Sequence, residues 1–248
     1  MIEVRELRKS FGAQRILDGV NLQIEEGESV VIIGRSGGGK SVLLKQLIGL
    51  LKPDSGDVLI DGENIVRMDE RQLLRVRQKF GMLFQGSALF DSMTVAENIA
   101  FPFRRRRELK PEEIARRVSG ALEMVELPGT ESKKPSELSG GMKKRVGLAR
   151  AIVYQPEIVL YDEPTTGLDP IVADSIDRLI MRVRDQLKVT TVVVTHDMRS
   201  ARRVGHRILM LHDKRIHASG TPDEIFSSQD PVVRRFIEGI SDPKELYF

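Results

Sequence analysis

A glycine-rich loop between an apolar run and a helical pattern constrains this chain more than any other feature. The apolar run covers residues 29–33, and a continuous run of this kind predicts a strand buried on both faces of a parallel sheet. Residues 34–41 follow with the sequence Gly-Arg-Ser-Gly-Gly-Gly-Lys-Ser, and residues 40–50 have a helical pattern. Strand, G-x-x-x-x-G-K-S and helix in this order distinguish a phosphate-binding loop from a chance glycine-rich turn. We therefore expect an α/β protein that binds the phosphate groups of a nucleotide.

Each residue type in this loop suits phosphate binding. Glycines carry no Cβ atom, so the backbone can curl and point its N–H groups inward, and the next helix adds the positive end of its dipole. Lys40 would place its charge on the β- and γ-phosphates, and the Ser41 hydroxyl would bind Mg²⁺. The expected phosphate-binding residues are Gly34, Arg35, Ser36, Gly37, Gly38, Gly39, Lys40, Ser41 and Val42.

A second strand pattern, at residues 158–161, ends in two acidic residues, Asp162 and Glu163. Ligands of open α/β sheets bind at the carboxyl ends of the strands. Asp162 would hold Mg²⁺ through water, and Glu163 would orient or deprotonate the attacking water. The alternative is a strand that simply ends in two solvated acids. The phosphate loop favours the metal site, because Mg²⁺ needs a carboxylate from this region.

A second glycine segment, Leu138-Ser139-Gly140-Gly141-Met142, precedes another helical pattern. The Ser139 hydroxyl can cap that helix, and the two glycines leave its first turn open to a polyanion. A well-capped helix without any ligand explains the same residues equally well. Local physics leaves both interpretations open.

Composition narrows the class of protein. The chain has 248 residues with 40% apolar side chains, which supports a full core. The net charge of +3 is too small to indicate nucleic acid as a partner. The absence of cysteine excludes disulfides and thiolate metal sites. No uncharged apolar run reaches the roughly 18 residues of a membrane span, and no apolar signal core is seen near Met1. If the protein serves a membrane process, we expect a partner to cross the bilayer.

The order of periodic patterns predicts an α/β core interrupted by helices. We expect the core to cover residues 1–85 and 156–225, a helical subdomain to cover 86–155, and a C-terminal helix and tail to cover 226–248. The expected strands are residues 2–7, 20–24, 29–33, 56–62, 80–84, 158–161 and 191–195. The expected helices are residues 40–50, 95–100, 112–125, 140–154 and 173–186.

Taken together, the motifs resemble those of ATP-binding cassette (ABC) ATPases. The resemblance covers roughly residues 1–225 and implies a P-loop NTPase (RecA-like) core with N-terminal antiparallel β strands and an inserted α-helical subdomain. The segments that carry it, in the family's order, are 34–41, Gln85, 138–141, 162–163, 167–169 and 195–197. In that family, the Leu-Ser-Gly-Gly segment of one subunit closes over the γ-phosphate held by the other, so a two-fold homodimer encloses two ATP molecules.

The resemblance implies a role for each matched residue. The catalytic residues would be Lys40, Gln85, Glu163 and His196. Among them, Glu163 would be the base, and His196 would contact the γ-phosphate. Ser41, Gln85 and Asp162 would bind Mg²⁺. The nucleotide would also contact Phe11 at its adenine, and Ser139, Gly140, Gly141 and Asp169 across the dimer. The family usually has Gln at the position of Met142, whose side chain cannot make an amide hydrogen bond.

Three segments resemble a narrower branch, the ATPases of Mla/Mce-type lipid transporters: residues 36–45, 82–95 and 138–142. That resemblance implies ATP-driven phospholipid transport between bacterial membranes. It also implies integral membrane permease partners whose coupling helix docks near residues 86–103, a further soluble subunit, and a place at the cytoplasmic face of the inner membrane. Apolar residues near the insertion would line the receiving groove or pack its own core: Ala88, Leu89, Phe90, Phe101 and Phe103.

Two other functions remain open at this point, namely an ABC importer for a polar solute and a soluble ABC ATPase that acts on nucleic acid or ribosomes. The arginine run at residues 104–107 is expected to be a solvated loop, with anionic lipid heads as the alternative. The three histidines at 206, 212 and 217 lack metal-ligand spacing. The tail at 240–248 would be a frayed terminus or would dock on a second subunit.

Overall fold

The computed structural model describes residues 2–105 and 109–241. The chain divides into two compact units: a first unit of Met1–Leu73 with Val193–Phe248, and a second unit of Leu74–Val192. Two elements cross the boundaries between the units, α2 (Glu70–Arg77) and β8 (Thr190–Thr195). The side chains of the arginine run at 104–107 and the tail residues 242–248 lie outside the described residues.

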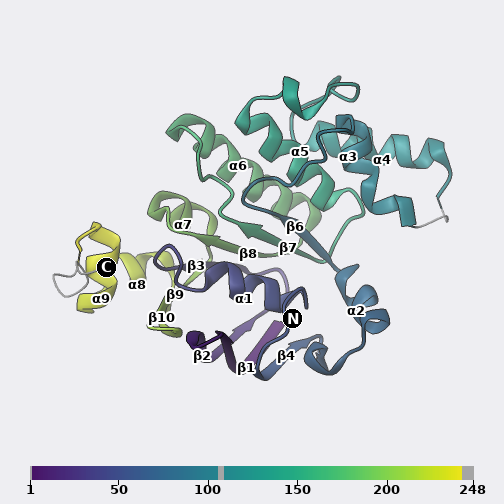
Figure 1. Cartoon of the computed structure of the whole chain (residues 1–248). Helices are drawn as coiled ribbons and strands as arrows, with labels where there is room; N and C mark the ends of the chain where they lie inside the picture. The colour runs from purple at the N-terminus through teal and green to yellow at the C-terminus, as the bar shows by residue number, and fades with distance from the viewer. Residues whose placement is uncertain (1, 106–108, 242–248) are drawn as a thin grey trace. The chain divides into compact units, whose positions relative to one another are not determined.

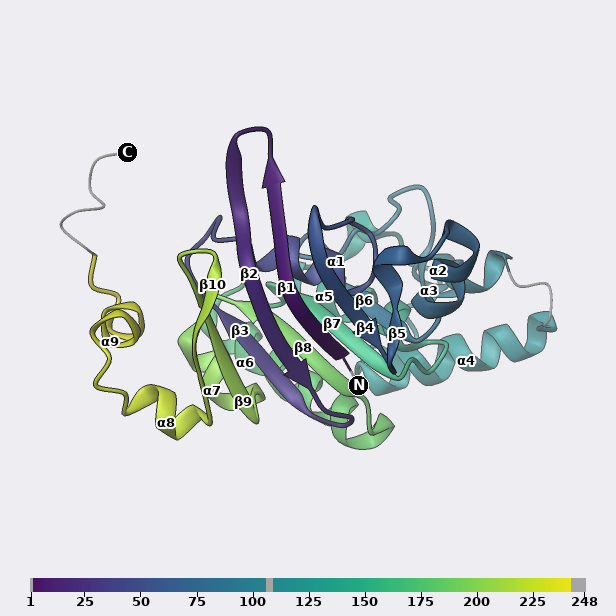
Figure 2. The ribbon, with the colours of Figure 1, turned by 90° about the horizontal axis from the view of Figure 1, so that it is seen from below.

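Strands dominate the first unit. An antiparallel sheet has the order β2-β1-β4-β5, and Figure 2 shows its long β1–β2 hairpin beside β4. Separately, β3 pairs in parallel with β9, and β9 pairs antiparallel with β10. The strands are β1 (Ile2–Phe11), β2 (Gln14–Ile24), β3 (Ser29–Ile33), β4 (Ser55–Ile60), β5 (Glu63–Asn64), β9 (Arg207–His212) and β10 (Arg215–Gly220). The helices are α1 (Lys40–Leu47), η1 (Ile65–Arg67), α7 (Met198–Val204), α8 (Pro222–Phe226) and α9 (Pro231–Glu238).

The β1–β2 hairpin extends beyond the predicted strands at residues 2–7 and 20–24. Its outer half is polar, so it lacks the alternation of apolar residues that predicts a strand. Ion pairs take the place of that pattern: Arg8 contacts Asp18 at 3.3 Å, and Arg15 contacts the same carboxylate at 3.2 Å. Gly12, at φ 57°, turns the chain between the strands. This part of the sheet forms through backbone hydrogen bonds between strands with polar side chains. The apolar pattern of the sequence therefore does not predict it.

Helix α1 begins at Lys40 as predicted and ends at Leu47, before the predicted limit at residue 50. Gly49 lies just beyond the helix at φ 67°, and the Leu50 N–H donates to the Lys45 carbonyl at 2.9 Å. This arrangement is the glycine-containing stop that satisfies the last helical carbonyls. The helix therefore ends at Leu47. At its other end, the first turn directly follows the loop at residues 34–39.

Helices dominate the second unit. The helices α3, α4 and α5 pack against one another, as Figure 1 shows in the teal part of the chain, and the strands β6 and β7 form a parallel pair. The elements are β6 (Phe80–Leu83), α3 (Val95–Ala100), η2 (Phe101–Arg105), α4 (Pro111–Met124), η3 (Pro135–Glu137), α5 (Gly140–Ile152), β7 (Ile158–Asp162) and α6 (Pro170–Leu187). Mixed α/β structure with an antiparallel N-terminal sheet and parallel strands confirms the predicted fold class.

Side-chain caps fix where these helices begin. The Thr94 hydroxyl accepts from the Glu97 N–H at 3.2 Å, and the Glu97 carboxylate accepts from the Thr94 N–H at 2.8 Å. This capping box starts α3. Asp169 starts α6 in the same way, by accepting the N–H groups of Ile171 and Val172, each at 3.0 Å. These two side-chain caps therefore fix where α3 and α6 begin, and Asp169 is itself one of the predicted site residues.

Candidate functional site

The glycine loop follows β3, whose residues are all buried, and leads into α1. Two glycines are required by close packing. A Cβ on Gly34 would lie 2.4 Å from the Leu211 carbonyl oxygen, and one on Gly39 would lie 3.0 Å from side-chain carbons of Ile16 and Leu17. Both residues also have positive φ, 154° and 99°. The loop conformation therefore depends on glycine for steric and conformational reasons.

Lys40 lies at the end of this loop and is only 5% exposed. Its ammonium group folds back and donates to the carbonyl oxygens of Gly34 at 2.8 Å and Arg35 at 2.9 Å. A buried ammonium group requires such partners. The cation is therefore held inside the curl of the loop, where the phosphates of a nucleotide are expected.

Two further predicted site residues belong to the first unit. His196 follows β8 and is exposed; the next residue, Asp197, caps α7 by accepting the Arg199 N–H at 2.8 Å. Phe11, at the end of β1, is 49% exposed, and the Lys9 ammonium lies 5.5 Å from the centre of its ring. An exposed aromatic ring at a strand end suits a stacking role better than a core role.

The acidic pair lies in the second unit, at the carboxyl end of β7. Asp162 is the last strand residue, and Glu163 follows with φ 48°; both are buried. The Thr166 hydroxyl donates to the Glu163 carboxylate at 3.1 Å. A non-glycine residue at positive φ is uncommon and marks a position that its surroundings constrain. The structure thus gives Glu163 a defined orientation.

Gln85 follows β6 and lies near the acidic pair through a shared neighbour. The Lys144 ammonium donates to the backbone carbonyl of Gln85 and, at 3.2 Å, to that of Glu163. Burial lowers the pKa of Lys144, while the carboxylates of Asp162 and Glu163 oppose that shift. The sequence analysis missed Lys144. A signal was present, since Lys144 is three residues after the buried Gly141 and four before the buried Leu148, on one helix face.

The second glycine segment lies against Leu168 and Val172, at the start of α6. Ser139 caps α5 as predicted, because its hydroxyl accepts the Met142 N–H at 3.3 Å. A Cβ on Gly140 would lie 3.4 Å from Leu168, and one on Gly141 would lie 2.6 Å from Val172. Ser139, Gly140 and Asp169 are exposed. This surface is therefore formed and accessible, as a residue set that completes another subunit's site must be.

The predicted metal ligands offer the donors that Mg²⁺ prefers: the hydroxyl of Ser41, the amide oxygen of Gln85 and the carboxylate of Asp162. Over residues 2–105 and 109–241, no group of three or more His, Cys, Asp or Glu side chains could hold a metal. Hydroxyl, amide and carboxylate oxygens are the donor types that suit a magnesium ion bound together with nucleotide phosphates.

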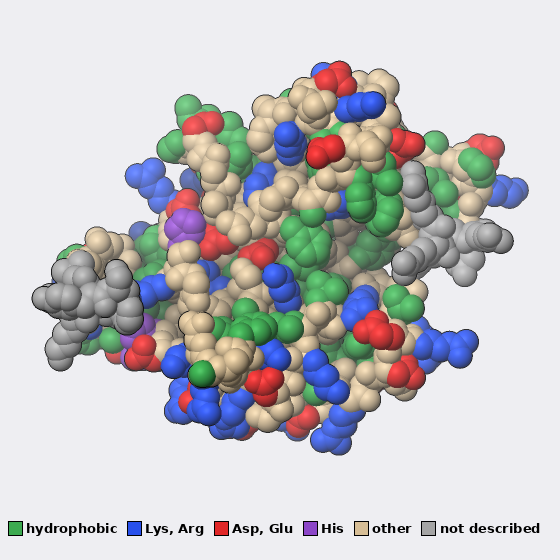
Figure 3. All heavy atoms as spheres, in the orientation of Figure 1, with side chains coloured by type: hydrophobic (Ala, Val, Ile, Leu, Met, Phe, Trp, Pro, Cys, Tyr) green, Lys and Arg blue, Asp and Glu red, His purple; other side chains and the backbone are tan. Residues whose placement is uncertain are grey.

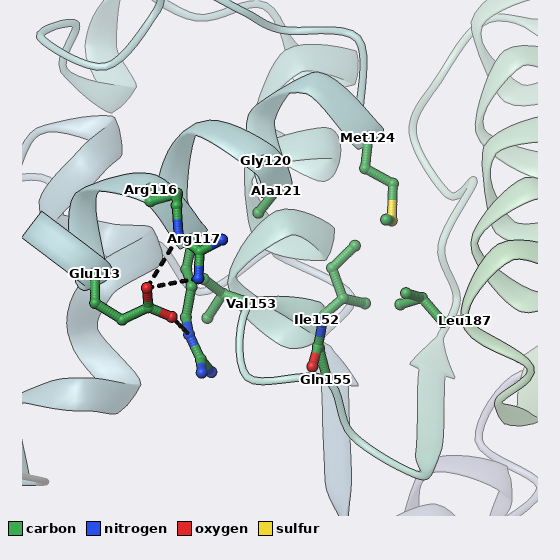
Figure 4. Close-up of a pocket in the computed structure, with 10 residues that line it drawn as sticks. All are labelled: Glu113, Arg116, Arg117, Gly120, Ala121, Met124, Ile152, Val153, Gln155 and Leu187. Carbon is green, nitrogen blue, oxygen red and sulfur yellow. Dashed lines mark hydrogen bonds and ion pairs between the residues drawn. The ribbon is translucent and has the colours of Figure 1, made fainter. Parts of the chain in front are cut away.

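A cavity of about 340 Å³ lies elsewhere in the second unit, between α4 and the end of α5. Figure 4 shows Glu113 turned toward Arg116 and Arg117, to which it pairs at 2.6 and 2.7 Å. Met124, Ile152 and Leu187 form its apolar side. None of the predicted site residues lines this cavity, so it does not belong to the candidate site.

Over the face drawn in Figure 3, positive and negative side chains are interspersed, in agreement with the small net charge.

A glycine loop between β3 and α1, and an acid-bearing end of β7, define a nucleotide-binding protein of the P-loop class. The model of the family described as "ABC transporter" matches residues 17–166, more than half of the chain. The chain belongs to this family and is an ABC ATPase that binds and hydrolyses ATP. The predicted resemblance is confirmed.

Individual relatives agree. The "probable ribonucleotide transport ATP-binding protein mkl" of Mycobacterium leprae is 46% identical over 96% of this chain and 69% of that protein. The "intermembrane phospholipid transport system ATP-binding protein MlaF" of Haemophilus influenzae is 41% identical over 98% of this chain and 92% of that protein. A solved dimeric ATP-binding cassette, bound to ADP and phosphate after hydrolysis, is 36% identical with a TM-score of 0.82, over 90% of this chain and 99% of that one.

The alignment with MlaF, which covers 98% of this chain, supports the branch expected from the sequence. Among the described residues, no helix combines the length and the apolar character needed to cross a bilayer.

Proposed function

We propose that this chain energises phospholipid transport between bacterial membranes by hydrolysing ATP at the inner membrane's cytoplasmic face. The observation that carries the proposal is the 41% identity to MlaF of H. influenzae over 98% of the chain, a protein named for intermembrane phospholipid transport. The chain would act through integral membrane permease subunits, together with a further soluble subunit.

In this proposal, two copies of the chain enclose two ATP molecules. The glycine loop of one copy, with Lys40, would bind the β- and γ-phosphates, and Ser139 with Gly140 of the other copy would close over the γ-phosphate. The exposure of Ser139, Gly140 and Asp169 supports this arrangement. The dimeric state of the similar solved cassette supports it as well.

The remaining residues would act on the reacting γ-phosphate. Mg²⁺, held by Ser41, Gln85 and Asp162, would neutralise charge on the phosphate oxygens. Glu163 would accept a proton from the attacking water, because its carboxylate is held in place by Thr166. His196 would contact the γ-phosphate, and Phe11 would stack on adenine. The gain in binding free energy on ATP-driven closure would then be available to move the membrane subunits.

The membrane subunits would dock near residues 86–103. Phe90 and Phe101 support this proposal, because both are exposed and their rings lie 4.5 Å apart, centre to centre. Phe103 is buried and packs in the core of the second unit. Of the apolar residues predicted to line a groove or pack a core, Phe103 thus belongs to the core, and Phe90 and Phe101 are accessible for the proposed docking.

A second candidate is transport of a polar solute, favoured by the ribonucleotide named for the 46% identical mycobacterial relative. Both functions use the same ATPase, so the test is the cargo. The chain, co-purified with its membrane subunits, is reconstituted in lipid vesicles, and ATP-dependent movement of labelled phospholipid and of labelled ribonucleotide is measured. We expect phospholipid alone to move. Permease partners that move only the ribonucleotide would overturn the lipid proposal and leave the ATPase assignment intact.

A further inference from the structure

Lys144 is a buried cation in the second unit that the proposed mechanism has not used. It lies on α5, one helical turn beyond Gly140, and is 5% exposed. Its ammonium group donates to two backbone carbonyls, those of Gln85 and Glu163. These two residues come from separate segments of the chain, one after β6 and one after β7. Lys144 therefore joins the two loops that carry a proposed metal ligand and the proposed base.

The surroundings of Lys144 compensate in part for the burial of its charge. Burial of a charge is unfavourable unless it is paired and hydrogen-bonded. Two carbonyl oxygens supply the hydrogen bonds, and the carboxylates of Asp162 and Glu163 supply opposite charge. The Glu163 carbonyl in turn needs a donor, since Glu163 is buried and an unpaired buried carbonyl is unfavourable. The cation and the two loops thus depend on one another.

The loop after Gln85 is held by the same helix at a second point. Ser87 and Ala88 have positive φ, 60° and 47°, which side chains other than glycine seldom adopt. Arg150 of α5 donates to both of their carbonyl oxygens, each at 2.6 Å. Strained backbone of this kind persists where its surroundings fix it. Lys144 and Arg150 together therefore fix the path of residues 85–88 on α5.

We propose that Lys144 is a positioning residue for ATP hydrolysis, which fixes the backbone of Gln85 relative to that of Glu163. Its removal would let the metal ligand and the base move apart, and displacement of reacting groups by about 1 Å can lower a rate about a hundredfold. ATP binding should change little, because the phosphate loop at residues 34–41 belongs to the first unit and makes none of these hydrogen bonds. The inference rests on the roles proposed above for Gln85 and Glu163.

The test compares four variants in the complex of the chain with its membrane subunits. Lys144→Met removes the cation at nearly constant size, and Lys144→Arg keeps a donor and the charge. Lys143→Met is the matched control, since it changes the neighbouring, more exposed lysine of the same helix. Glu163→Gln reports on the base itself. ATP affinity, kcat and the Mg²⁺ concentration for half-maximal activity are measured, with kcat expressed per mole of bound ATP so that unfolded protein does not count.

We expect Lys144→Met to lower kcat between about tenfold and a hundredfold and to raise the Mg²⁺ requirement, with ATP affinity changed less than about threefold. Lys144→Arg should recover most of the rate, and Lys143→Met should match the unsubstituted protein. Equal kcat values for Lys144→Met and Lys143→Met would overturn the inference. Should Lys144→Met fail to fold, Lys144→Gln takes its place with the same expectation. Full turnover in Glu163→Gln would instead overturn the proposed base, so the two failures are distinguishable.

Discussion

Neighbouring residues hold individual side chains of the candidate site in a defined conformation. Glu163 is the clearest case, because its backbone is held at positive φ and its carboxylate accepts the Thr166 hydroxyl. Glu163→Gln keeps the shape of the side chain and its contact with Thr166 while removing the base. We expect kcat to fall by about 10²- to 10⁴-fold, the usual contribution of a general base, with ATP affinity retained.

The measurement is steady-state ATP hydrolysis, together with equilibrium binding of ATP. Glu157→Gln is the control, because Glu157 is an exposed carboxylate that directly precedes β7, whereas Glu163 directly follows it. If Glu163→Gln hydrolyses ATP as fast as Glu157→Gln, another group must be the base.

Gly141 gives a second prediction at this scale. A Cβ at this position would lie 2.6 Å from the Cγ1 atom of Val172, so Gly141→Ala should displace the start of α5 from α6. We expect destabilisation of about 1–3 kcal/mol, the usual result of overpacking. Gly120→Ala in α4 is the control, since nothing lies within 4 Å of its Cβ position. There, alanine should stabilise the helix by about 0.5–1 kcal/mol. Denaturant unfolding measures both, and a Gly141→Ala variant as stable as Gly120→Ala would contradict the packing argument.

At the scale of elements, Glu126 joins three helices of the second unit. It follows α4, and its carboxylate pairs with Arg145 of α5, at 2.8 Å, and with Arg182 of α6. The hydrogen bond to Arg145, and to a smaller extent that to Arg182, lowers the pKa of Glu126. A lowered pKa in the folded state contributes stability above the unfolded value of about 4.3. That contribution is lost as the pH falls through the lowered folded-state pKa.

We therefore expect Glu126→Gln to lower the Tm at pH 7 and to differ less from the unsubstituted protein at pH 3. Thermal unfolding followed by circular dichroism at both pH values tests this. Glu123→Gln, which changes an exposed residue one turn earlier, is the control and should have little effect at either pH. A Tm difference for Glu126→Gln that is the same at pH 3 and pH 7 would show that the ion pairs contribute no pH-dependent stability.

The elements also show what the sequence predicts and what it leaves out. Apolar runs and periodicity located β3, α3 and β7 within a residue or so of their observed limits, because burial of apolar side chains leaves a local signal in the sequence. The outer half of the β1–β2 hairpin was missed, because backbone pairing there is accompanied by polar side chains. Lys144 was missed for a related reason. Its position on the inner face of α5 was a signal, but its partners are backbone carbonyls far away in the sequence, which no side-chain pattern encodes.

At the scale of the whole molecule, the site is proposed to be shared between two copies. Lys40→Ala and Ser139→Glu chains should each be inactive, the second because a carboxylate at the exposed Ser139 position would repel phosphate. A mixed dimer would contain one site with both defects and one site with neither. We therefore expect mixing of the two inactive chains to restore up to about a quarter of the wild-type rate, since about half of randomly formed dimers are mixed and each has one intact site.

ATP hydrolysis by the mixture, compared with each variant alone, is the measurement. The control is a mixture of the single variant Lys40→Ala with the double variant Lys40→Ala/Glu163→Gln. It should stay inactive, because every site in it lacks Lys40. No recovery in the first mixture, with dimers present by size-exclusion chromatography, would contradict a shared site.

The way Lys40 is held has a consequence for selectivity. Its hydrogen bonds to the carbonyls of Gly34 and Arg35 keep the positive charge occupied within the loop. A small anion such as inorganic phosphate would have to displace these carbonyls while offering few contacts in return. A nucleotide offers a longer phosphate chain, a metal and a base, whose combined contacts offset that displacement. The carbonyls of Gly34 and Arg35 would thus compete with any bound anion for the Lys40 ammonium group.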